Sequence, residues 1–588
     1  MDKQKILSTA NEYIQQEQND VFKQEVIDLV AKEDFTELED RFYKSLEFGT
    51  GGLRGVIGGG TNRINTLMVN KATQGLASYC IKALPEKAKD GTLRAVIAYD
   101  SRRYSDVFAE AAALIFCANG FTTYLFSGLR PTPELSYAIR ELDCTTGIVV
   151  TASHNPPQYN GYKAYWNDGA QVTAPHDTGI IEEVNTVTDI KTISREDALA
   201  SGKLVMIDSE IDDKYWAMCK EQLFRPDLIK EKAKEVKVVY TPLHGTGAMH
   251  VEKVLGDLGL AVSTVPEQRS PDGNFPTVEK PNPEEAPALK MAVDLAKKEK
   301  ADVVMATDPD SDRFGSAVPD ANGNYVLITG NQMGVLLADY IIISRNELGK
   351  MPANPAIVRS IVTSPMIDSL CKKNGVHLEE CLTGFKWIAS VMADYEKTGR
   401  NNYIFGLEES YGYNVETEVR DKDGISAAAM CAELTLYWRS KGISLLERLE
   451  QLYTEYGYYE DRAISKNFEG SSGVEVMAGI MTKLRTEGLK SLGGKKVELI
   501  RDIGNAVSFS PENPAVKTPI NLPTSNVLQF VLEGGTIVSA RPSGTEPKIK
   551  FYVNAVEPIS CCLDTSKAAA GALCDAIEKE IYAVLDNA

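Results

Sequence analysis

The sequence predicts an α/β protein built from several domains, and three observations lead to this prediction. The chain has 588 residues, whereas a domain with one hydrophobic core typically holds about 150. Strand-like β-branched runs alternate with amphipathic helical patterns along most of the chain, which is typical of sheets covered by helices. Beyond a stretch rich in Tyr, Gly and Ser, which starts near residue 453, strands frame helices in a different order. We therefore expect three related mixed α/β domains followed by a smaller C-terminal α+β domain.

The individual elements follow from local hydrophobic periodicity and from Pro and Gly at their ends. The predicted elements are, in order, a strand at 94–100 (RAVIAYD), a helix at 105–121, a strand at 122–126 (TTYLF), a strand at 236–240 (VKVVY), a helix near 249–258, a helix at 283–300 with Pro283 near its start, a strand at 301–306, a helix at 330–343, a strand at 401–406 and a final helix at 565–588. The expected domains are 1–210 with an N-terminal helical extension, 211–328, 329–457 and 458–588.

Composition limits the classes of function. The formal net charge of −19 disfavours nucleic acids and acidic membranes as partners, so a phosphate ligand would need a local cluster of cations. The ten cysteines have no metal-type spacing, and the adjacent Cys561 and Cys562 are poorly placed to bridge each other, so we expect free thiols in a reducing compartment. The N-terminus has no apolar signal region and no segment has 18 unbroken apolar residues. We expect a cytoplasmic location.

Four polar loops follow predicted strands directly. They are the loops 151–156 (TASHNP), 308–313 (DPDSDR), 406–410 (GLEES) and 541–548 (RPSGTEPK). Ligands of α/β sheets bind outside the carboxyl ends of the strands, where loops vary on a rigid scaffold. The four loops therefore predict one ligand site shared by four domains.

The loop 308–313 indicates a metal. Asp308, Asp310 and Asp312 alternate, which in an extended segment would place three carboxylates on one side. Such carboxylates repel one another unless a hard cation such as Mg²⁺ neutralises them. An EF-hand is excluded, because Arg313 and Pro319 stand where that loop needs Gly and Glu. The alternative is an acidic solvated turn.

The loop 541–548 has the composition of a phosphate cradle, with Arg541 and Lys548 for charge, hydroxyls at Ser543 and Thr545, and a permissive Gly544. The alternative is a polar hairpin between two strands. The segment 48–55 (FGTGGLRG) similarly surrounds Arg54 with glycines, but it fits no dinucleotide fingerprint, and the sequence contains no Walker A motif.

Ser153 ends a β-branched run and is followed by His154, so it is either part of an ordinary strand-to-loop turn or a serine presented for chemistry. A serine hydrolase is disfavoured, because Thr151 and Asn155 flank the serine where a nucleophile elbow needs glycines. We also expect His154 to be an awkward base for Ser153, since neighbouring side chains along a chain rarely point at each other.

Together the motifs TASHNP, DPDSDR, GLEES and RPSGTEPK, in this order, resemble the four active-site loops of the α-D-phosphohexomutase superfamily. The resemblance extends from about residue 48 to residue 548. It implies four domains, three related α/β units and a smaller terminal one, around a central cleft.

The resemblance also assigns roles to residues. It implies that Ser153 is phosphorylated and that Asp308, Asp310 and Asp312 hold Mg²⁺ together with an oxygen of that phosphate. The other implied roles are the sugar-hydroxyl contacts Thr383, Gly384, Glu408 and Ser410, the phosphate clamp Arg541, Ser543, Gly544 and Thr545, the reacting-site arginines Arg54 and Arg313, and the basic residues His154, Lys163 and Lys422.

The implied activity is that of an isomerase of the phosphoglucomutase type, a phosphoprotein that passes the phosphoryl group of Ser153 to a sugar monophosphate. Glucose 1,6-bisphosphate would be the intermediate and activator, and small sugar phosphates would be the ligands. A histidine found in mannose-accepting members after the sugar loop is missing from residues 410–413 (SYGY), which favours glucose over mannose. The alternatives are a phosphopentomutase, a dual phosphoglucomutase/phosphomannomutase and a silent sugar-phosphate-binding protein. The sequence sets no expectation for the oligomeric state.

Overall fold

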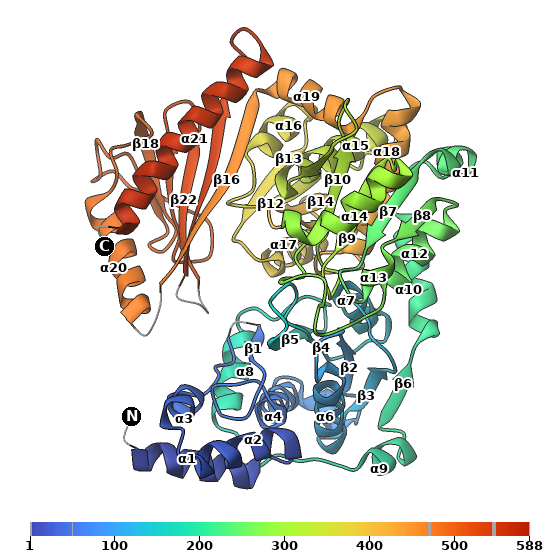
Figure 1. Cartoon of the computed structure of the whole chain (residues 1–588), viewed down its shortest axis with the longest axis vertical. Coiled ribbons are helices and arrows are strands. Elements are labelled where there is room, and N and C mark those ends of the chain that lie inside the picture. Colours follow the sequence, from blue (N-terminus) through green and yellow to red (C-terminus); the bar gives the residue numbers. More distant parts are fainter. Residues whose placement is uncertain (1–2, 50, 469–471, 544–547, 587–588) are drawn as a thin grey trace. The chain divides into compact units, whose positions relative to one another are not determined.

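A computed structural model describes residues 3–49, 51–468, 472–543 and 548–586 (Figure 1). These residues form two compact units. Unit 1 comprises residues 1–329 and 410–437, and unit 2 comprises residues 330–409 and 438–588. Each unit contains two sheets, and each is described by itself.

The first sheet of unit 1 has the strand order β1-β5-β4-β2-β3-β6. The strands are β1 (Gly52–Val56), β5 (Tyr159–Trp166), β4 (Thr146–Val150), β2 (Arg94–Tyr99), β3 (Thr122–Phe126) and β6 (Leu204–Ile207). Strands β4, β2, β3 and β6 are parallel, whereas β5 and β1 pair antiparallel. The sheet therefore combines parallel and antiparallel pairs.

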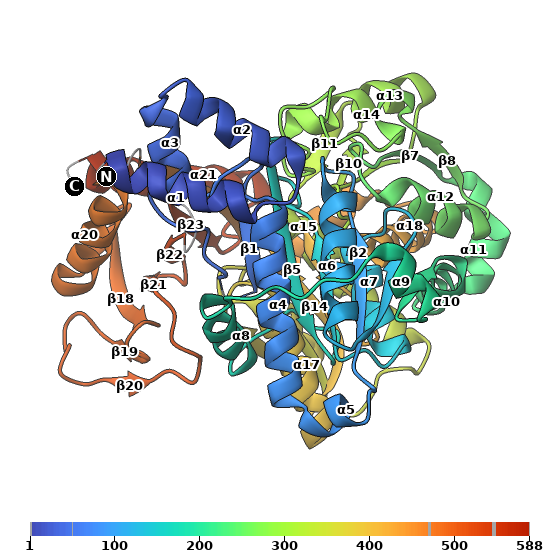
Figure 2. The same ribbon diagram turned by 90° about the horizontal axis from the view of Figure 1, so that it is seen from below.

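Helices cover both faces of this sheet. On one face lie α4 (Thr66–Ala83) and α6 (Ser105–Ala118), which pack their buried apolar residues against the strands (Figure 2). On the other face α7 (Thr132–Glu141) and α10 (Ser209–Glu221) bury residues such as Leu135 and Ile211. All five residues of β4 are buried, as expected for a strand that is covered on both faces.

Three helices precede the first sheet. They are α1 (Lys3–Gln16), α2 (Asp20–Ala31) and α3 (Phe35–Phe42), and their apolar faces form a small core with Leu67 of α4. The carboxylate of Glu25 accepts the backbone N–H of Gly59, and Arg41 donates to the carbonyl of Gly59. The N-terminal helices therefore fix the loop that follows β1.

The second sheet of unit 1 has the order β11-β10-β9-β7-β8. Its strands are β7 (Lys237–Thr241), β8 (Ala261–Thr264), β9 (Val303–Thr307), β10 (Phe314–Pro319) and β11 (Tyr325–Ile328), with helices α12 (Gly247–Asp257) and α14 (Ala286–Glu299) beside them. The expected helix start at Pro283 is wrong, because Glu285 is extended and Pro287 occupies the first turn. Unit 1 also includes β15 (Gly412–Asn414) and most of α18 (Gly424–Ser440).

In unit 2, β12 (Pro355–Ser360) pairs in parallel with β13 (His377–Cys381) on one side and with β14 (Asn402–Glu408) on the other. Helices α15 (Gly330–Glu347), α16 (Met366–Asn374), α17 (Phe385–Thr398) and α19 (Leu445–Tyr456) accompany these strands.

The terminal sheet of unit 2 has the path β16-β23-β22-β21-β18-β19-β20 and is antiparallel, and β17 pairs with β18. Its elements are β16 (Tyr458–Asn467), β17 (Ser491–Leu492), β18 (Lys495–Asp502), β19 (Val507–Phe509), β20 (Thr518–Pro519), β21 (Leu528–Leu532), β22 (Ile537–Pro542) and β23 (Lys548–Glu557), with helices α20 (Ser472–Glu487) and α21 (Leu563–Asp586). Apolar residues of both helices and of the sheet form one core.

Three α/β sheets and a β-rich terminal sheet confirm the predicted fold class. The domain limits at residues 210, 328 and 457 and the central cleft stay predictions. In the part of the chain that the structure describes, none of the helices has the length and apolar character needed to cross a membrane.

Candidate active site

Ser153 stands on a tight turn at the carboxyl end of β4. Its φ of 51° lies in the left-handed region, and its side chain is buried. The backbone N–H of Ser153 donates to Thr151 Oγ1 at 2.8 Å, and that hydroxyl donates to Asp100 Oδ2 at 2.6 Å. Through Thr151, the carboxylate of Asp100 at the end of the neighbouring strand β2 therefore stabilises the turn.

Two side chains meet the hydroxyl of Ser153. Its Oγ donates to Asp308 Oδ2 at 2.5 Å and lies 3.1 Å from His154 Nδ1. The expectation that His154 would point away from Ser153 is wrong, because the left-handed residue breaks the alternation of an extended chain. The hydroxyl of Ser153 is thus buried between a carboxylate and an imidazole, and its chemical role stays a prediction.

The aspartate cluster consists of Asp308, Asp310 and Asp312, which follow β9. All three are buried, and they offer carboxylate oxygens that lie within 4.8 Å of one another. The expected extended geometry is wrong, because Ser311 has a φ of 53° and its N–H donates to the carbonyl of Asp308 at 2.9 Å. A turn, and not strand alternation, gathers the three carboxylates.

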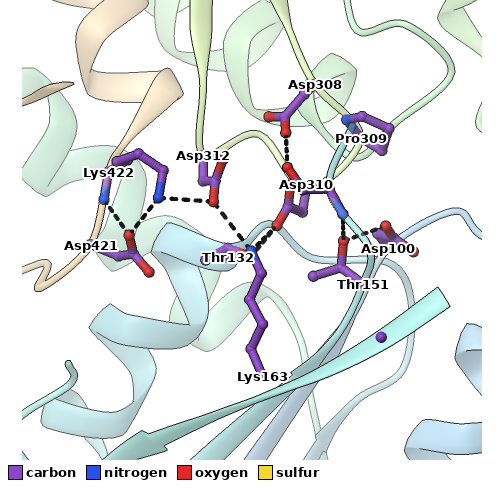
Figure 3. Close-up of polar contacts among 12 residues, drawn as sticks. Asp100, Thr132, Thr151, Lys163, Asp308, Pro309, Asp310, Asp312, Asp421 and Lys422 are labelled. Carbon is purple, nitrogen blue, oxygen red and sulfur yellow. Dashed lines mark hydrogen bonds and ion pairs between the residues drawn. The ribbon is translucent and has the colours of Figure 1, made fainter. Parts of the chain in front are cut away.

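Two lysines balance the charge of the aspartate cluster (Figure 3). Lys163 Nζ, from β5, lies 2.7 Å from Asp310 Oδ2 and 3.2 Å from Asp312 Oδ2. Lys422 Nζ lies 3.2 Å from the same oxygen of Asp312. Burial opposes ionisation of Asp312, but the ammonium groups of Lys422 and Lys163 hold its pKa below the ordinary range. Burial, and then the charges of Asp310 and Asp312, raise the pKa of Asp308 well above its usual value.

The aspartate cluster fits a hard divalent cation. Oδ1 of Asp310 and Oδ1 of Asp312 are buried and have no hydrogen-bond partner among the described residues, and Asp308 adds a third carboxylate. Carboxylate oxygens are the ligands that Mg²⁺ prefers, and buried acceptors without donors are costly unless a ligand satisfies them. These three residues could therefore hold Mg²⁺.

Residues that the sequence analysis missed support the loop 308–313. Thr132, at the start of α7, donates its N–H to Asp310 O at 2.9 Å and its hydroxyl to Asp310 Oδ2 at 2.8 Å. The N–H of Thr246 donates to Pro309 O at 2.8 Å. A Cβ on Gly245 would lie 2.3 Å from the Cα of Pro309, so only glycine permits this close approach. No local signal marks Thr132, whereas TPLHGTG is a polar stretch at the end of a predicted strand.

Arg54, Arg313 and His154 lie around the same serine. Arg54, on β1, donates to Asn155 Oδ1 at 3.3 Å, and Arg313 is ion-paired with Glu284. Burial, followed by the positive charges of Arg313 and Arg54, lowers the pKa of His154 well below its ordinary value. His154 is therefore neutral at pH 7.

The segment after β15 carries Lys422 to the aspartate cluster. Its ammonium group also lies 3.0 Å from Asp421 Oδ1, and Tyr165 of β5 donates to Asp421 Oδ2 at 2.7 Å. The N–H of Gly424 donates to the carbonyl of Ser311 at 3.0 Å. Unit 1 thus brings together every predicted catalytic and metal-binding residue: Arg54, Ser153, His154, Lys163, Asp308, Asp310, Asp312, Arg313 and Lys422.

Unit 2 holds most of the residues assigned to sugar contacts. Gly384 has a φ of 115°, and its N–H donates to Glu408 Oε1, at the end of β14, at 2.6 Å. The hydroxyl of Thr383 is buried and has no partner in the described ranges. Glu409, which lies in the predicted loop 406–410 but was given no role, accepts hydrogen bonds from Ser360 and Thr363. Ser410 belongs to unit 1.

The predicted phosphate loop joins β22 to β23. Arg541 lies on β22, opposite Lys550 of β23, and the N–H of Ser543 donates to the carbonyl of Lys548 at 2.7 Å. Gly544 and Thr545 lie outside the described residues. The clamp role of this loop stays a prediction.

Family models match three consecutive parts of the chain. They are described as phosphoglucomutase/phosphomannomutase α/β/α domains I, II and III, and they match residues 45–191, 213–323 and 329–456.

Similar proteins cover almost the whole chain. A probable phosphoribomutase of Schizosaccharomyces pombe is 35% identical over 558 residues, 92% of each chain. A phosphoglucomutase of Staphylococcus aureus is 36% identical over 528 residues, 88% of this chain and 91% of that protein. The structure of a putative phosphomannomutase from Thermus thermophilus has a TM-score of 0.66 at 20% identity, over 92% of this chain and 99% of the other, and supports the fold alone.

Proposed function

The chain belongs to the phosphoglucomutase/phosphomannomutase family and is an intramolecular phosphotransferase, and we propose that it interconverts glucose 1-phosphate and glucose 6-phosphate through a phosphorylated Ser153. One observation carries this proposal: Ser153 Oγ lies 2.5 Å from Asp308 Oδ2, within the aspartate cluster and beside two lysines. A hydroxyl among potential metal ligands and cations suits phosphoryl transfer, which depends on positioning and charge neutralisation.

The first half-reaction transfers the phosphoryl group of Ser153 to the free hydroxyl of a sugar monophosphate. The bond between phosphorus and Ser153 Oγ breaks, the bond to the sugar oxygen forms, and the hydroxyl proton passes to a base. His154, which is neutral, and Lys163 and Lys422, which adjoin the aspartate cluster, are the proposed proton carriers. The product is a sugar bisphosphate such as glucose 1,6-bisphosphate.

The second half-reaction returns the other phosphate of the bisphosphate to Ser153 and releases the isomeric monophosphate. A phosphoserine carries a charge of about −1.5 to −2, which Arg54, Arg313, Lys163 and Lys422 would offset. When bound at Asp308, Asp310 and Asp312, Mg²⁺ would polarise the phosphorus towards attack. Added bisphosphate would phosphorylate Ser153 and so act as an activator.

The remaining assignments concern the sugar and the phosphate that is not transferred. We assign Thr383, Gly384, Glu408 and Ser410 to the sugar hydroxyls, and the buried hydroxyl of Thr383, which has no partner among the described residues, supports this role. We assign Arg541, Ser543, Gly544 and Thr545 to the phosphate, because an arginine fork and hydroxyls match phosphate oxygens. The ligands are sugar phosphates, and the ten free cysteines support a reducing, cytoplasmic location.

A pentose phosphate is the second candidate substrate. The similarity to a probable phosphoribomutase is as strong as the similarity to a phosphoglucomutase, and both proposals share Ser153 and the aspartate cluster. The missing histidine at residues 410–413 still disfavours mannose phosphate.

A coupled assay tests these proposals. Purified protein with Mg²⁺ and a trace of glucose 1,6-bisphosphate is given glucose 1-phosphate, ribose 1-phosphate or mannose 1-phosphate. We expect the highest kcat/KM with glucose 1-phosphate and loss of turnover on chelation. A preference for ribose 1-phosphate would mean that a pentose phosphate is the substrate, and it would leave the proposed mechanism unchanged.

The variant Ser153→Ala tests the phosphoserine. It should abolish turnover and retain the melting temperature within a few degrees, because the turn is held through the backbone of Ser153. Turnover near the wild-type rate would refute the role of Ser153.

A further inference from the structure

Arg102 follows β2, and its side chain is fully buried. Its guanidinium donates hydrogen bonds to backbone carbonyls of one segment of the chain. It donates to the carbonyl oxygens of Ser153 at 2.6 Å and of Pro156 and Tyr159 at 2.9 Å each, and also to that of Asn155. Residues 153–159, which we call the serine segment, thus share one cation as hydrogen-bond donor. None of the four motifs of the sequence analysis includes Arg102.

Asp100 holds the other side of Ser153. Its Oδ2 accepts the hydroxyl of Thr151, whose oxygen accepts the N–H of Ser153. Its Oδ1 accepts the N–H of Arg102 and the hydroxyl of Ser105, each at 2.9 Å. The backbone N–H and the carbonyl of Ser153 are therefore both fixed by Asp100 and Arg102. Asp100 Oδ2 and Arg102 Nε lie 3.5 Å apart.

Only an arginine suits this position. The left-handed φ of Ser153 is unfavourable for a residue with a Cβ and persists only where surrounding contacts enforce it. Buried carbonyls also require donors, and a planar guanidinium supplies five N–H groups, whereas an ammonium supplies three from a single point. Burial lowers the pKa of Arg102 to about 10, with Asp100 opposing this, so the group is charged at neutral pH.

We infer that Arg102, together with Asp100 and Thr151, is a positioning residue that fixes Ser153 Oγ in line for phosphoryl transfer. This inference rests on the proposed function of Ser153. Arg102 acts through the carbonyls of the serine segment and needs no contact with the sugar. Misplacement of a reacting group by about 1 Å can cost about 100-fold in rate. Loss of the forked guanidinium group of Arg102 should therefore lower kcat more than it changes KM.

The variant Arg102→Lys keeps the charge and removes the fork. Arg448→Lys is the matched control, because Arg448 is also paired with a buried carboxylate, Asp339, and lies 4.4 Å from an aromatic ring, as Arg102 lies 4.9 Å from that of Phe275. We measure kcat and KM, and by intact mass the single-turnover rate at which glucose 1,6-bisphosphate phosphorylates Ser153. Arg102→Lys should lower kcat and the phosphorylation rate at least 30-fold with KM changed less than threefold. Arg448→Lys should change neither rate.

A second pair of variants covers the case in which Arg102→Lys does not fold. Thr151→Val removes the hydroxyl between Asp100 and Ser153 at nearly constant volume, and Thr151→Ser restores it. Thr151→Val should lower the phosphorylation rate about tenfold, and Thr151→Ser should recover most of it. Wild-type phosphorylation rates in folded Arg102→Lys and Thr151→Val would overturn the inference.

Hydrogen–deuterium exchange separates this inference from the proposed function, since it needs no turnover. Residues 151–159 should lose protection in Arg102→Lys and Thr151→Val, and should keep it in Arg448→Lys. Unchanged exchange would overturn the positioning role. A wild-type protein that is neither phosphorylated nor active, but whose variants lose this protection, would instead refute the proposed function alone.

Discussion

Lys163 and Lys422 act as counter-ions of the aspartate cluster in the structure. Burial alone would lower the pKa of Lys163, but Asp310 and Asp312 outweigh burial and raise it. At 2.7 Å from Asp310 Oδ2, the ammonium group neutralises part of the negative charge that would also attract a divalent cation to the aspartate cluster. A divalent cation and Lys163 would therefore compete for the same negative charge.

The variant Lys163→Met should bind Mg²⁺ more tightly and turn over more slowly. Removing a cation from a buried cluster of carboxylates strengthens their attraction for another cation, so we expect the Kd of Mg²⁺ to fall several-fold in titration calorimetry. Lys82→Met is the control, because Lys82 is exposed and pairs with Glu183 away from the aspartate cluster. Weaker Mg²⁺ binding by Lys163→Met would contradict the competition.

Asp461, on β16, is predicted to make stability depend on pH. Burial raises its pKa from 3.8 to about 6, so the folded state holds the proton between these values. The contribution of this group to the free energy of unfolding is therefore present below pH 4 and is lost as the pH rises through 6. Asp461→Asn cannot ionise and so avoids this loss. Between pH 4 and pH 7.5 its free energy of unfolding should rise on the order of 2 kcal/mol relative to that of wild type.

Urea unfolding of wild type and Asp461→Asn at several pH values measures this difference. The variant Asp90→Asn, which changes an exposed carboxylate, is the control. If the stability difference between Asp461→Asn and wild type does not change with pH, the prediction is wrong.

At the scale of elements, the loop of Ser153 and the loop of the aspartate cluster turn in the same way. Each follows a buried strand, and each passes through a left-handed serine, Ser153 in one and Ser311 in the other. The strands could be predicted because β-branched runs are local patterns. The turns could not, since a left-handed serine depends on hydrogen bonds from residues far along the chain, such as Arg102 to Ser153 and Thr246 to Ser311.

The two exposed cysteines of the chain, Cys561 and Cys562, lie directly before α21. The pKa of Cys562 is lowered by the hydroxyl of Thr565 and by N–H groups at the start of the helix, which favours the reactive thiolate. Brief treatment with iodoacetamide followed by peptide mass spectrometry should therefore label Cys562 first and Cys561 next.

The eight buried cysteines should label only after unfolding, and Cys562→Ser should remove the fast phase. Burial raises the pKa of the thiol of Cys431 to about 12, so early labelling there would contradict the burial of α18.

At the scale of the whole molecule, sequence patterns could predict the four sheets and the four polar loops, but not the composition of the compact units. Loop 308–313 and Lys422 are more than 100 residues apart, and their contact has no local pattern. The resemblance to a family implied that both belong to one site, and the structure shows the ion pair between Lys422 and Asp312 that joins them. Thr132 and Arg102 escaped prediction for the same reason, because their partners lie 178 and 51 residues away.

The segment 410–437 completes unit 1 although it follows 80 residues of unit 2, those at 330–409. The carboxylate of Glu433 accepts the N–H groups of Phe224 and Arg225, and Asp423 Oδ1 accepts the hydroxyl of Tyr215 at 2.8 Å. Loss of a partner of a buried polar group costs about 1–3 kcal/mol each. Removal of the segment would leave several such groups unpaired and expose the apolar surface that packs on α18.

A fragment of residues 1–329 should therefore unfold at least 10 °C below a fragment in which a Gly/Ser linker joins residue 329 to residues 410–437. Circular dichroism melting of the two fragments measures this difference. The joined fragment with Glu433→Gln is a further comparison: it keeps the added helix and weakens its attachment to residues 224 and 225, so it should melt between the other two. Equal melting temperatures for all three fragments would mean that residues 1–329 already form a complete folding unit.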